Sequence, residues 1–324
     1  SRVRILLPSD TESPKKIYQL KQAMGGHVFP VVKDSEGFER YFVPGIFDIW
    51  FHKNVTHSRA LSVIQELGLR ITNQRPKVGY YEVELGIYPQ GMHVAAATFD
   101  KIGAALQAPE IAFAEQAEVG FEDFDPANER FIPDFEDAHS GSRTWNLDLI
   151  EAADAHQISQ GEPNVTILIV DSGVYPDHPD LASGLRPDWP TLDLNFDVGV
   201  PEAESSPLEL AITHGTKVAS VAVGRGPSDS SRVKGVAPGC WFLPVKISGA
   251  PFGQSYGLRA AAILEAIQYI EEGHRGVLNL SWSTNGEHIG IREALLEAHR
   301  SGIAIVTSAG NYGFGEPQVP DKPH

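Results

Sequence analysis

The chain has 324 residues, 42% of them hydrophobic, which is enough for a large core with a smaller companion domain, or for two ordinary domains. Its 42 acidic and 26 basic residues give a net charge of −16, which argues against nucleic acid and anionic lipid as partners. No apolar run approaches the roughly 20 residues of a membrane span, and no signal-peptide pattern opens the sequence. Cys240 is the only cysteine, which excludes an intrachain disulfide and leaves the compartment unassigned.

The N-terminal third alternates predicted strands and helices. Residues 1–42 form an extension without an interpretable motif, in which Ser35-Glu36-Gly37 predicts a hairpin. Residues 43–120 follow the order strand, helix, strand, strand, helix, strand, which predicts a ferredoxin-like α+β domain. Thr56 is the expected N-cap of its first helix, and Gly68 ends that helix. This order of elements alone implies no function.

Residues 121–143 are expected to form an acidic linker. Nine carboxylates and one arginine lie between Glu115 and Ser142, a composition that cannot bury enough apolar surface to fold alone. From 144 to 324 predicted strands alternate with helices, starting with a helical spacing over 145–156, and this predicts an α/β domain with a doubly wound, mostly parallel sheet. A nucleotide-binding Rossmann domain is disfavoured because no G-x-G-x-x-G follows a predicted strand.

A run of β-branched and aliphatic residues ends at Asp171. Residues 165–170 lack helical spacing and precede Asp171-Ser172-Gly173, which predicts a buried central strand of a parallel sheet. Asp171 then lies at the carboxyl end of that strand, the edge of open α/β sheets at which ligands and reacting groups collect. A carboxylate in this place is either a cap of the following turn or a functional group.

His214 and Asn311 are the other candidates for acid–base or electrostatic chemistry. His214 precedes a small apolar helix, and Gly215 allows close approach of the backbone. A carboxylate bonded to one imidazole nitrogen would fix the tautomer and stabilise the imidazolium, although a single histidine at a helix start is also typical of a cap. Asn311 follows a turn, and it is either a turn former or an amide donor for the negative oxygen of a tetrahedral intermediate.

Five motifs in order resemble the subtilisin-like serine proteases, the subtilases of the peptidase S8 family. They are VDSG at 170–173 with HPDL at 178–181, HGTKVAS at 214–220, GVAP at 235–238, NLS at 279–281 and SAGN at 308–311. The resemblance implies a serine endopeptidase with an Asp-His-Ser triad. In it Asp171 would orient His214, His214 would act as general base and then acid, and Asn311 would stabilise the oxyanion.

The resemblance also implies how a substrate binds. An extended polypeptide would lie beside Gly253 and Gln254 as an added strand. The S1 pocket would be walled by residues at or just after the ends of two predicted strands, 277–282 and 303–308, namely Ser281, Trp282, Ser283, Ser308, Ala309 and Gly310. Trp282 stands where the family has a small aliphatic residue, and Ser283 stands where it has glycine. We therefore expect an altered pocket lining.

Residues 43–120 resemble the propeptide of this family, which assists folding and inhibits the site as an intramolecular partner. This likeness favours a secreted or extracytoplasmic protein. No cofactor is required. Calcium is an optional structural ion, and Asp180 in HPDL matches a position that can be a ligand, although one aspartate does not make a site.

The nucleophile has no match in the sequence. The family's serine lies in a G-T-S motif well after the oxyanion asparagine, and the thirteen residues after Asn311 contain no serine. The leading hypothesis is therefore a subtilase precursor whose sequence is truncated before the catalytic serine, so that these 324 residues alone are inactive. The alternative is a catalytically dead subtilase-like module that binds extended peptides without cutting them.

Overall fold

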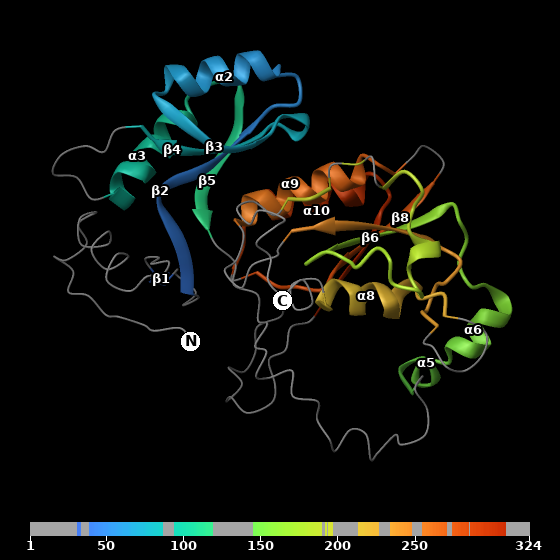
Figure 1. The fold of residues 1–324 in the computed structure, drawn as a ribbon. Helices are drawn as coiled ribbons and strands as arrows, with labels where there is room; N and C mark the ends of the chain where they lie inside the picture. Colours follow the sequence, from blue (N-terminus) through green and yellow to red (C-terminus); the bar gives the residue numbers. More distant parts are fainter. Residues whose placement is uncertain are drawn as a thin grey trace. The chain divides into compact units, whose positions relative to one another are not determined.

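The computed structural model divides into two compact units (Figure 1). The first comprises Ser1–Gly120, Ser255–Ala261 and Asn285–Ile291, and the second comprises Phe121–Gln254, Ala262–Thr284 and Arg292–His324. The structure describes residues 31–33, 39–86, 94–118, 145–189, 192, 194–196, 213–226, 234–247, 255–270, 274–284 and 286–308. The predicted linker and most of the N-terminal extension lie outside these residues.

The sheet of the first unit is antiparallel throughout. Its strands are β1 (Val31–Lys33), β2 (Glu39–Phe51), β3 (Leu69–Arg75), β4 (Tyr80–Leu85) and β5 (Ile111–Glu118). β2 lies between β4 and β5, and β3 pairs with the other edge of β4. β1 pairs with the start of β2, so the hairpin predicted around residues 35–37 is confirmed.

Helices α2 (His57–Glu66) and α3 (Val94–Ala105), together with the short η1 (Pro76–Val78), complete the sequence of elements in this unit. Thr56 caps α2 as predicted, since its hydroxyl accepts the N–H of Arg59 at 3.3 Å. The core lies between the helices and the sheet, with Phe47, Ile49 and Val83 fully buried. The alternation of buried and exposed residues in the strands thus gives the sheet one apolar face for the helices.

The sheet of the second unit is parallel, which confirms the predicted α/β class. Its strands are β6 (Val165–Asp171), β7 (Trp241–Lys246), β8 (Arg275–Leu280) and β9 (Ala304–Thr307), in the order β7-β6-β8-β9. The chain runs from β6 to β7 on one side and then crosses to β8 on the other. The carboxyl end of β6 is therefore a topological switch point, where functional groups collect in open α/β sheets.

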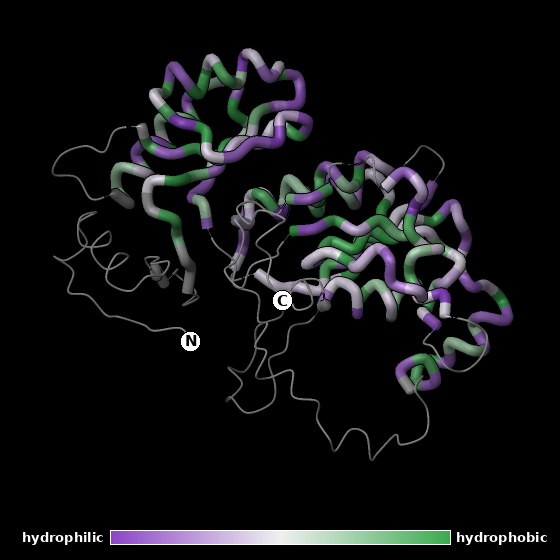
Figure 2. Tube along the Cα trace, viewed as in Figure 1, coloured by the Kyte–Doolittle hydropathy of each residue, from purple (hydrophilic) through white to green (hydrophobic). Residues whose placement is uncertain are grey.

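Helices α8 (Thr213–Val223), α9 (Tyr256–Ile267) and α10 (Ile289–Arg300) connect these strands. Within the second unit α8 covers one face of the sheet, and the later turns of α9 and α10 cover the other (Figure 1). Figure 2 shows the hydrophobic stretches concentrated along the sheet strands of this unit. Leu168, Ile169 and Val170 of β6 are fully buried, as a strand covered on both faces should be.

Two predicted boundaries differ from the structure. The helical spacing over 145–156 gives two short helices, α5 (Trp145–Leu149) and α6 (Ala152–Ile158), because Glu151 between them has a φ of 53°. β8 ends at Leu280 and not at Trp282. The side chains that follow it therefore need not alternate between the two faces of the sheet. Within the described ranges, no helix has the length and apolar character needed to cross a membrane.

Candidate functional site

Asp171 and His214 form a hydrogen-bonded pair at the carboxyl end of β6. The Nδ1 of His214 lies 2.8 Å from the Oδ1 of Asp171. A carboxylate oxygen can only accept, so Nδ1 carries a proton, and in the neutral imidazole Nε2 then keeps its lone pair. The Asp171 side chain is 3% exposed and that of His214 is 39% exposed. The aspartate is therefore sequestered, while the imidazole remains open to a reacting partner.

Small residues bring the two segments together. Gly215 at the start of α8 lies so close to the end of β6 that a Cβ there would meet the Gly173 carbonyl oxygen at 2.2 Å and the Asp171 Oδ1 at 3.1 Å. The hydroxyl of Ser172 accepts the N–H of Gly215 at 3.1 Å, and the Asp171 Oδ1 accepts the N–H of Ser172 at 2.7 Å. These contacts fix α8 against the strand end and leave no room for any residue other than glycine at 215.

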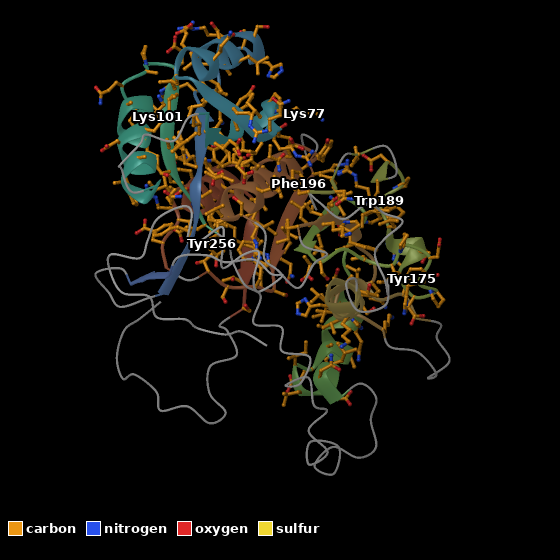
Figure 3. The ribbon with its side chains drawn as sticks, turned by 60° about the vertical axis from the view of Figure 1, so that its left-hand side comes forward. Lys77, Lys101, Tyr175, Trp189, Phe196 and Tyr256 are labelled. Carbon is orange, nitrogen blue, oxygen red and sulfur yellow. The ribbon has the colours of Figure 1, made fainter. Side chains whose placement is uncertain are left out.

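A further contact between the two segments was not predicted. The N–H of Tyr175, which is labelled in Figure 3, donates to the hydroxyl of Thr216 at 3.0 Å. Thr216 and Ser172 lie inside the HGT and DSG motifs, so the signal was present in the sequence. The motifs do not reveal this role, because the Ser172 and Thr216 hydroxyls bind backbone amides and take no part in proton transfer.

The expected substrate-binding residues are only partly described. Ser281, Trp282 and Ser283 follow β8 and are half-buried, and Ser308 follows β9 and is exposed. Since neighbouring parallel strands end at the same edge, these residues share an edge of the sheet with Asp171. Side-chain contacts join them, with the Ser308 hydroxyl 3.4 Å from the Trp282 carbonyl oxygen. Gly253, Gln254, Ala309, Gly310 and Asn311 lie outside the described residues.

Asp180 was considered as a calcium ligand. Its N–H lies 3.3 Å from the Nδ1 of His178, and its carbonyl oxygen accepts the N–H of Arg225 at 2.7 Å. In the part of the chain that the structure describes, no three histidine, cysteine or acidic side chains come together to hold a metal ion. Among the described residues, Asp180 therefore belongs to no acidic cluster of the kind that supplies several of the six or more oxygens that calcium requires.

The first unit contains a row of carboxylates across three adjacent strands. The strand register places Asp48 of β2 opposite Glu82 of β4 and Glu115 of β5. Asp48 is 1% exposed, and its two oxygens accept the hydroxyls of Tyr80 at 2.8 Å and Ser255 at 3.4 Å. Burial, together with the negative charges of Glu82 and Glu115, raises the pKa of Asp48 well above its ordinary value.

This row meets the first turns of two helices inside the same unit. The carboxylate of Glu115 accepts the N–H groups of Ile289 and Gly290, both at 2.9 Å, which are the first two residues of α10. At the start of α9, a Cβ on Gly257 would lie 2.3 Å from the Oδ2 of Asp48. First-turn amides have no partner within their helix and carry the positive end of the helix dipole. Glu115 therefore complements the start of α10, and the start of α9 lies in close contact with Asp48.

Beside this row, His288 and Glu118 form a buried pair. Their side chains are 2% and 4% exposed, and the His288 Nε2 lies 3.6 Å from the Glu118 Oε2. The ring of Tyr256, the first residue of α9 and labelled in Figure 3, lies 3.9 Å from the His288 ring between centroids. The contact between the sheet and the two helix starts is thus polar at its centre, and His288 and Glu118 are shielded from solvent.

A buried aspartate that orients a partly exposed histidine at the switch point of a parallel sheet is the acid–base arrangement of hydrolases with an activated nucleophile. The sequence pattern of the Subtilase family matches residues 162–323, half of the 324 residues, and this range contains both Asp171 and His214. The chain belongs to the Subtilase family, peptidase family S8, whose members are serine peptidases.

Individual relatives agree with this assignment. Thermitase from Thermoactinomyces vulgaris is 28% identical over 184 residues, which are 57% of this chain and 60% of thermitase. The crystal structure of fervidolysin from Fervidobacterium pennivorans, described as a keratinolytic enzyme related to subtilisin, shares the fold with a TM-score of 0.54 and 20% identity over 83% of this chain. The chain spans 40% of the fervidolysin structure, so it matches only part of the length of these relatives.

Proposed function

We propose that this chain supplies the aspartate and the histidine of an Asp-His-Ser triad in a serine endopeptidase. The observation that carries the proposal is the 2.8 Å contact between the buried Asp171 Oδ1 and the His214 Nδ1, inside the region that matches the family. The neighbouring helix start and the glycine at 215 give this contact a fixed geometry, as a proton-transfer pair requires.

The proposed reaction follows from the tautomer. With its Nδ1 proton held by Asp171, His214 takes the proton of a serine hydroxyl on Nε2 as that oxygen attacks the carbonyl carbon of a peptide bond. Asp171 stays ionised and stabilises the imidazolium that forms. His214 then gives the proton to the leaving amine, and water hydrolyses the acyl-enzyme by the same sequence of transfers. Asn311 is proposed to donate to the oxyanion, a contribution of about 100- to 1,000-fold in turnover in subtilisin.

The proposed substrate is a polypeptide in extended conformation. It would add as a strand beside Gly253 and Gln254, so that main-chain hydrogen bonds give affinity and side-chain pockets give selectivity. The segments 281–283 and 308–310 are proposed to wall the S1 pocket. An indole at position 282, where the family typically has a small aliphatic side chain, is proposed to alter the lining of this pocket.

We also propose that residues 43–120 are a propeptide, a ferredoxin-like domain that assists folding and inhibits the site. The succession β2, α2, β3, β4, α3, β5 with β2 in the middle of the sheet supports this proposal. So does the bidentate contact of Glu115 with the start of α10. The structural likeness to fervidolysin covers 83% of the chain and therefore extends beyond the residues that match the family pattern.

Hydrolysis of a denatured protein tests the proposed function. We expect the protein at its natural length to cleave casein, and we expect turnover to fall by about 10⁶-fold in His214→Ala and by about 10⁴-fold in Asp171→Asn. His299→Ala, on the exposed surface of α10, is the matched control and should keep full activity. Extended-peptide binding without cleavage would contradict the endopeptidase and favour a binding module. Sequencing the transcript past codon 324 adds an independent check, because an in-frame G-T-S motif favours the enzyme.

A further inference from the structure

Trp282 joins the ends of three strands at the edge that carries Asp171. Its indole N–H donates to the carbonyl oxygen of Val170 in β6 at 3.0 Å. Its own carbonyl oxygen lies 3.4 Å from the hydroxyl of Ser308, which follows β9. A small aliphatic residue, which the resemblance leads us to expect at this position, has no donor for the Val170 carbonyl. The contact with β6 is therefore a property of the tryptophan.

The indole N–H donates its hydrogen bond where the main-chain pairing between β6 and β8 ends. The β6–β8 pairing ends at Ile169 and Asn279, one residue before Val170. In a parallel sheet successive carbonyls of a strand point to opposite neighbours, and the Asp171 carbonyl accepts the N–H of Ile247 on the β7 side at 2.8 Å. The Val170 carbonyl consequently faces β8, whose strand has ended, and the side chain of Trp282 supplies the donor.

This donor holds the peptide from which the Asp171 side chain extends. Within the described part of the chain, the Oδ2 of Asp171 is buried and has no hydrogen-bond partner. The Oδ1 accepts both the N–H of Ser172 and the Nδ1–H of His214. The orientation of the carboxylate toward His214 therefore depends on the backbone at 170–171, which is held by Ile247 on one side and by Trp282 on the other.

We propose that Trp282 is a positioning residue for the Asp171–His214 pair, acting through its indole N–H on the Val170 carbonyl. The proposal rests on the proposed function only for its catalytic meaning, since the geometry it concerns exists in this chain without a substrate. It adds a role to a residue that the resemblance places in the pocket wall. A purely steric role would be kept by any aromatic ring of similar size, whereas a positioning role requires the N–H.

The test is the exchange of the His214 Nδ1 proton with water, measured by NMR on the 324-residue chain with ¹⁵N-labelled histidine. We expect Trp282→Phe to raise the exchange rate about tenfold, the range expected when a hydrogen bond that supports the pair is lost. Replacing the indole N–H by sulfur, with benzothienylalanine at 282, should do the same while keeping the ring volume. Asp171→Asn marks the fully uncoupled limit.

Trp241→Phe is the matched control, because Trp241 begins β7 at the opposite end of the sheet and should leave the rate within about twofold of the wild type. An unchanged exchange rate in the benzothienylalanine protein would overturn the proposal, even if Trp282→Phe failed to fold. The measurement needs no peptide hydrolysis. If the 324-residue chain keeps the coupled proton signal but the protein at its natural length cleaves nothing, the endopeptidase proposal fails and the positioning role stands.

Discussion

At the scale of single residues, Gly215 shows how one missing side chain builds the site. A Cβ at this position would lie 2.2 Å from the Gly173 carbonyl oxygen and 3.2 Å from the Cβ of Asp171. Both neighbours belong to the segment that ends β6, so neither can move without disturbing the strand. The close approach of α8 to Asp171, on which the hydrogen bond of His214 depends, is therefore possible only with glycine.

Gly215→Ala tests this requirement. We expect it to destabilise the chain by about 1–3 kcal/mol, because the added methyl group forces the helix start away from the strand end. Urea unfolding measures the free-energy change. Gly103→Ala is the control, since Gly103 lies within α3 with no atom within 4 Å of its added Cβ, and it should raise stability by about 0.5–1 kcal/mol. Equal stability of Gly215→Ala and the wild type would refute the steric argument.

Asp48 gives a prediction for the pH dependence of stability. Burial and the carboxylates of Glu82 and Glu115 raise its pKa, so the folded chain holds a proton that the unfolded chain has released. The stability that comes from this group is present below the ordinary carboxyl range and is lost as pH rises through the raised pKa. Within that window the free energy of unfolding should fall by up to about 1.4 kcal/mol per pH unit from this group.

Asp48→Asn should remove this part of the pH dependence, because the amide cannot titrate but can still accept the hydroxyl of Tyr80. Urea unfolding at a series of pH values above 4 provides the measurement. Asp100→Asn, on the exposed side of α3, should leave the slope of the wild type unchanged. A variant at Asp48 with the full wild-type slope would show that another group carries the titration.

The sequence predicted Asp171 and His214 as site residues, but it did not predict the Trp282 contact beside them. Asp171 and His214 were found because each follows or precedes a strongly patterned element, and parallel strands collect their polar ends at one edge. The indole contact of Trp282 could not be predicted, since it depends on where β8 ends and on the direction of a side chain outside any regular element. Local pattern carries no information on either.

At the scale of elements, the register of β2 with β4 and β5 aligns three carboxylates that lie far apart in the sequence. Like charges directly opposite each other destabilise a sheet unless another group compensates. In this unit the first-turn amides of α10 contact Glu115, and the first turn of α9 lies against Asp48. Glu115 and the start of α10 thus stabilise each other, while Asp48 avoids the like charges by its raised pKa.

Glu115→Gln tests how much the contact between Glu115 and the start of α10 contributes to stability. The glutamine keeps one oxygen for Ile289 or Gly290 but loses the charge, and we expect a cost of about 1–2 kcal/mol in unfolding free energy. If residues 43–120 are inhibitory, the same variant should raise the basal peptidase activity of the protein at its natural length. Glu66→Gln, an exposed carboxylate of α2, is the control and should change neither quantity. If Glu115→Gln lowers stability but leaves the activity unchanged, the inhibitory role is contradicted and the stabilising contact is not.

The spacing of apolar residues does not predict every helix boundary. The spacing of apolar residues over 145–156 predicts a helix, yet Glu151 adopts a left-handed conformation that divides it into α5 and α6. A positive φ at a glutamate carries no sequence signature of the kind that glycine gives. By contrast Thr56 was assigned correctly as a cap, because its hydroxyl and the following pattern of residues report the same helix start.

At the scale of the whole molecule, the two units carry different chemistry. The second unit holds the parallel sheet with the Asp171–His214 pair, and the first unit holds the antiparallel sheet with its row of carboxylates around the buried Asp48. The net charge of −16 of the whole sequence disfavours polyanionic partners. The proposed function, an enzyme precursor with a separate inhibitory part, would assign a role to each unit.

The most direct test of this account is covalent labelling of the protein at its natural length with a fluorophosphonate, followed by mass spectrometry of the labelled peptide. We predict that a single serine is labelled in the wild type, and that His214→Ala lowers the labelling rate by at least about 10³-fold, because the serine then lacks its general base. Labelling of His214→Ala at the wild-type rate, or peptide cleavage by a protein that the reagent does not label, would contradict the assignment of Asp171 and His214 to a serine-peptidase triad.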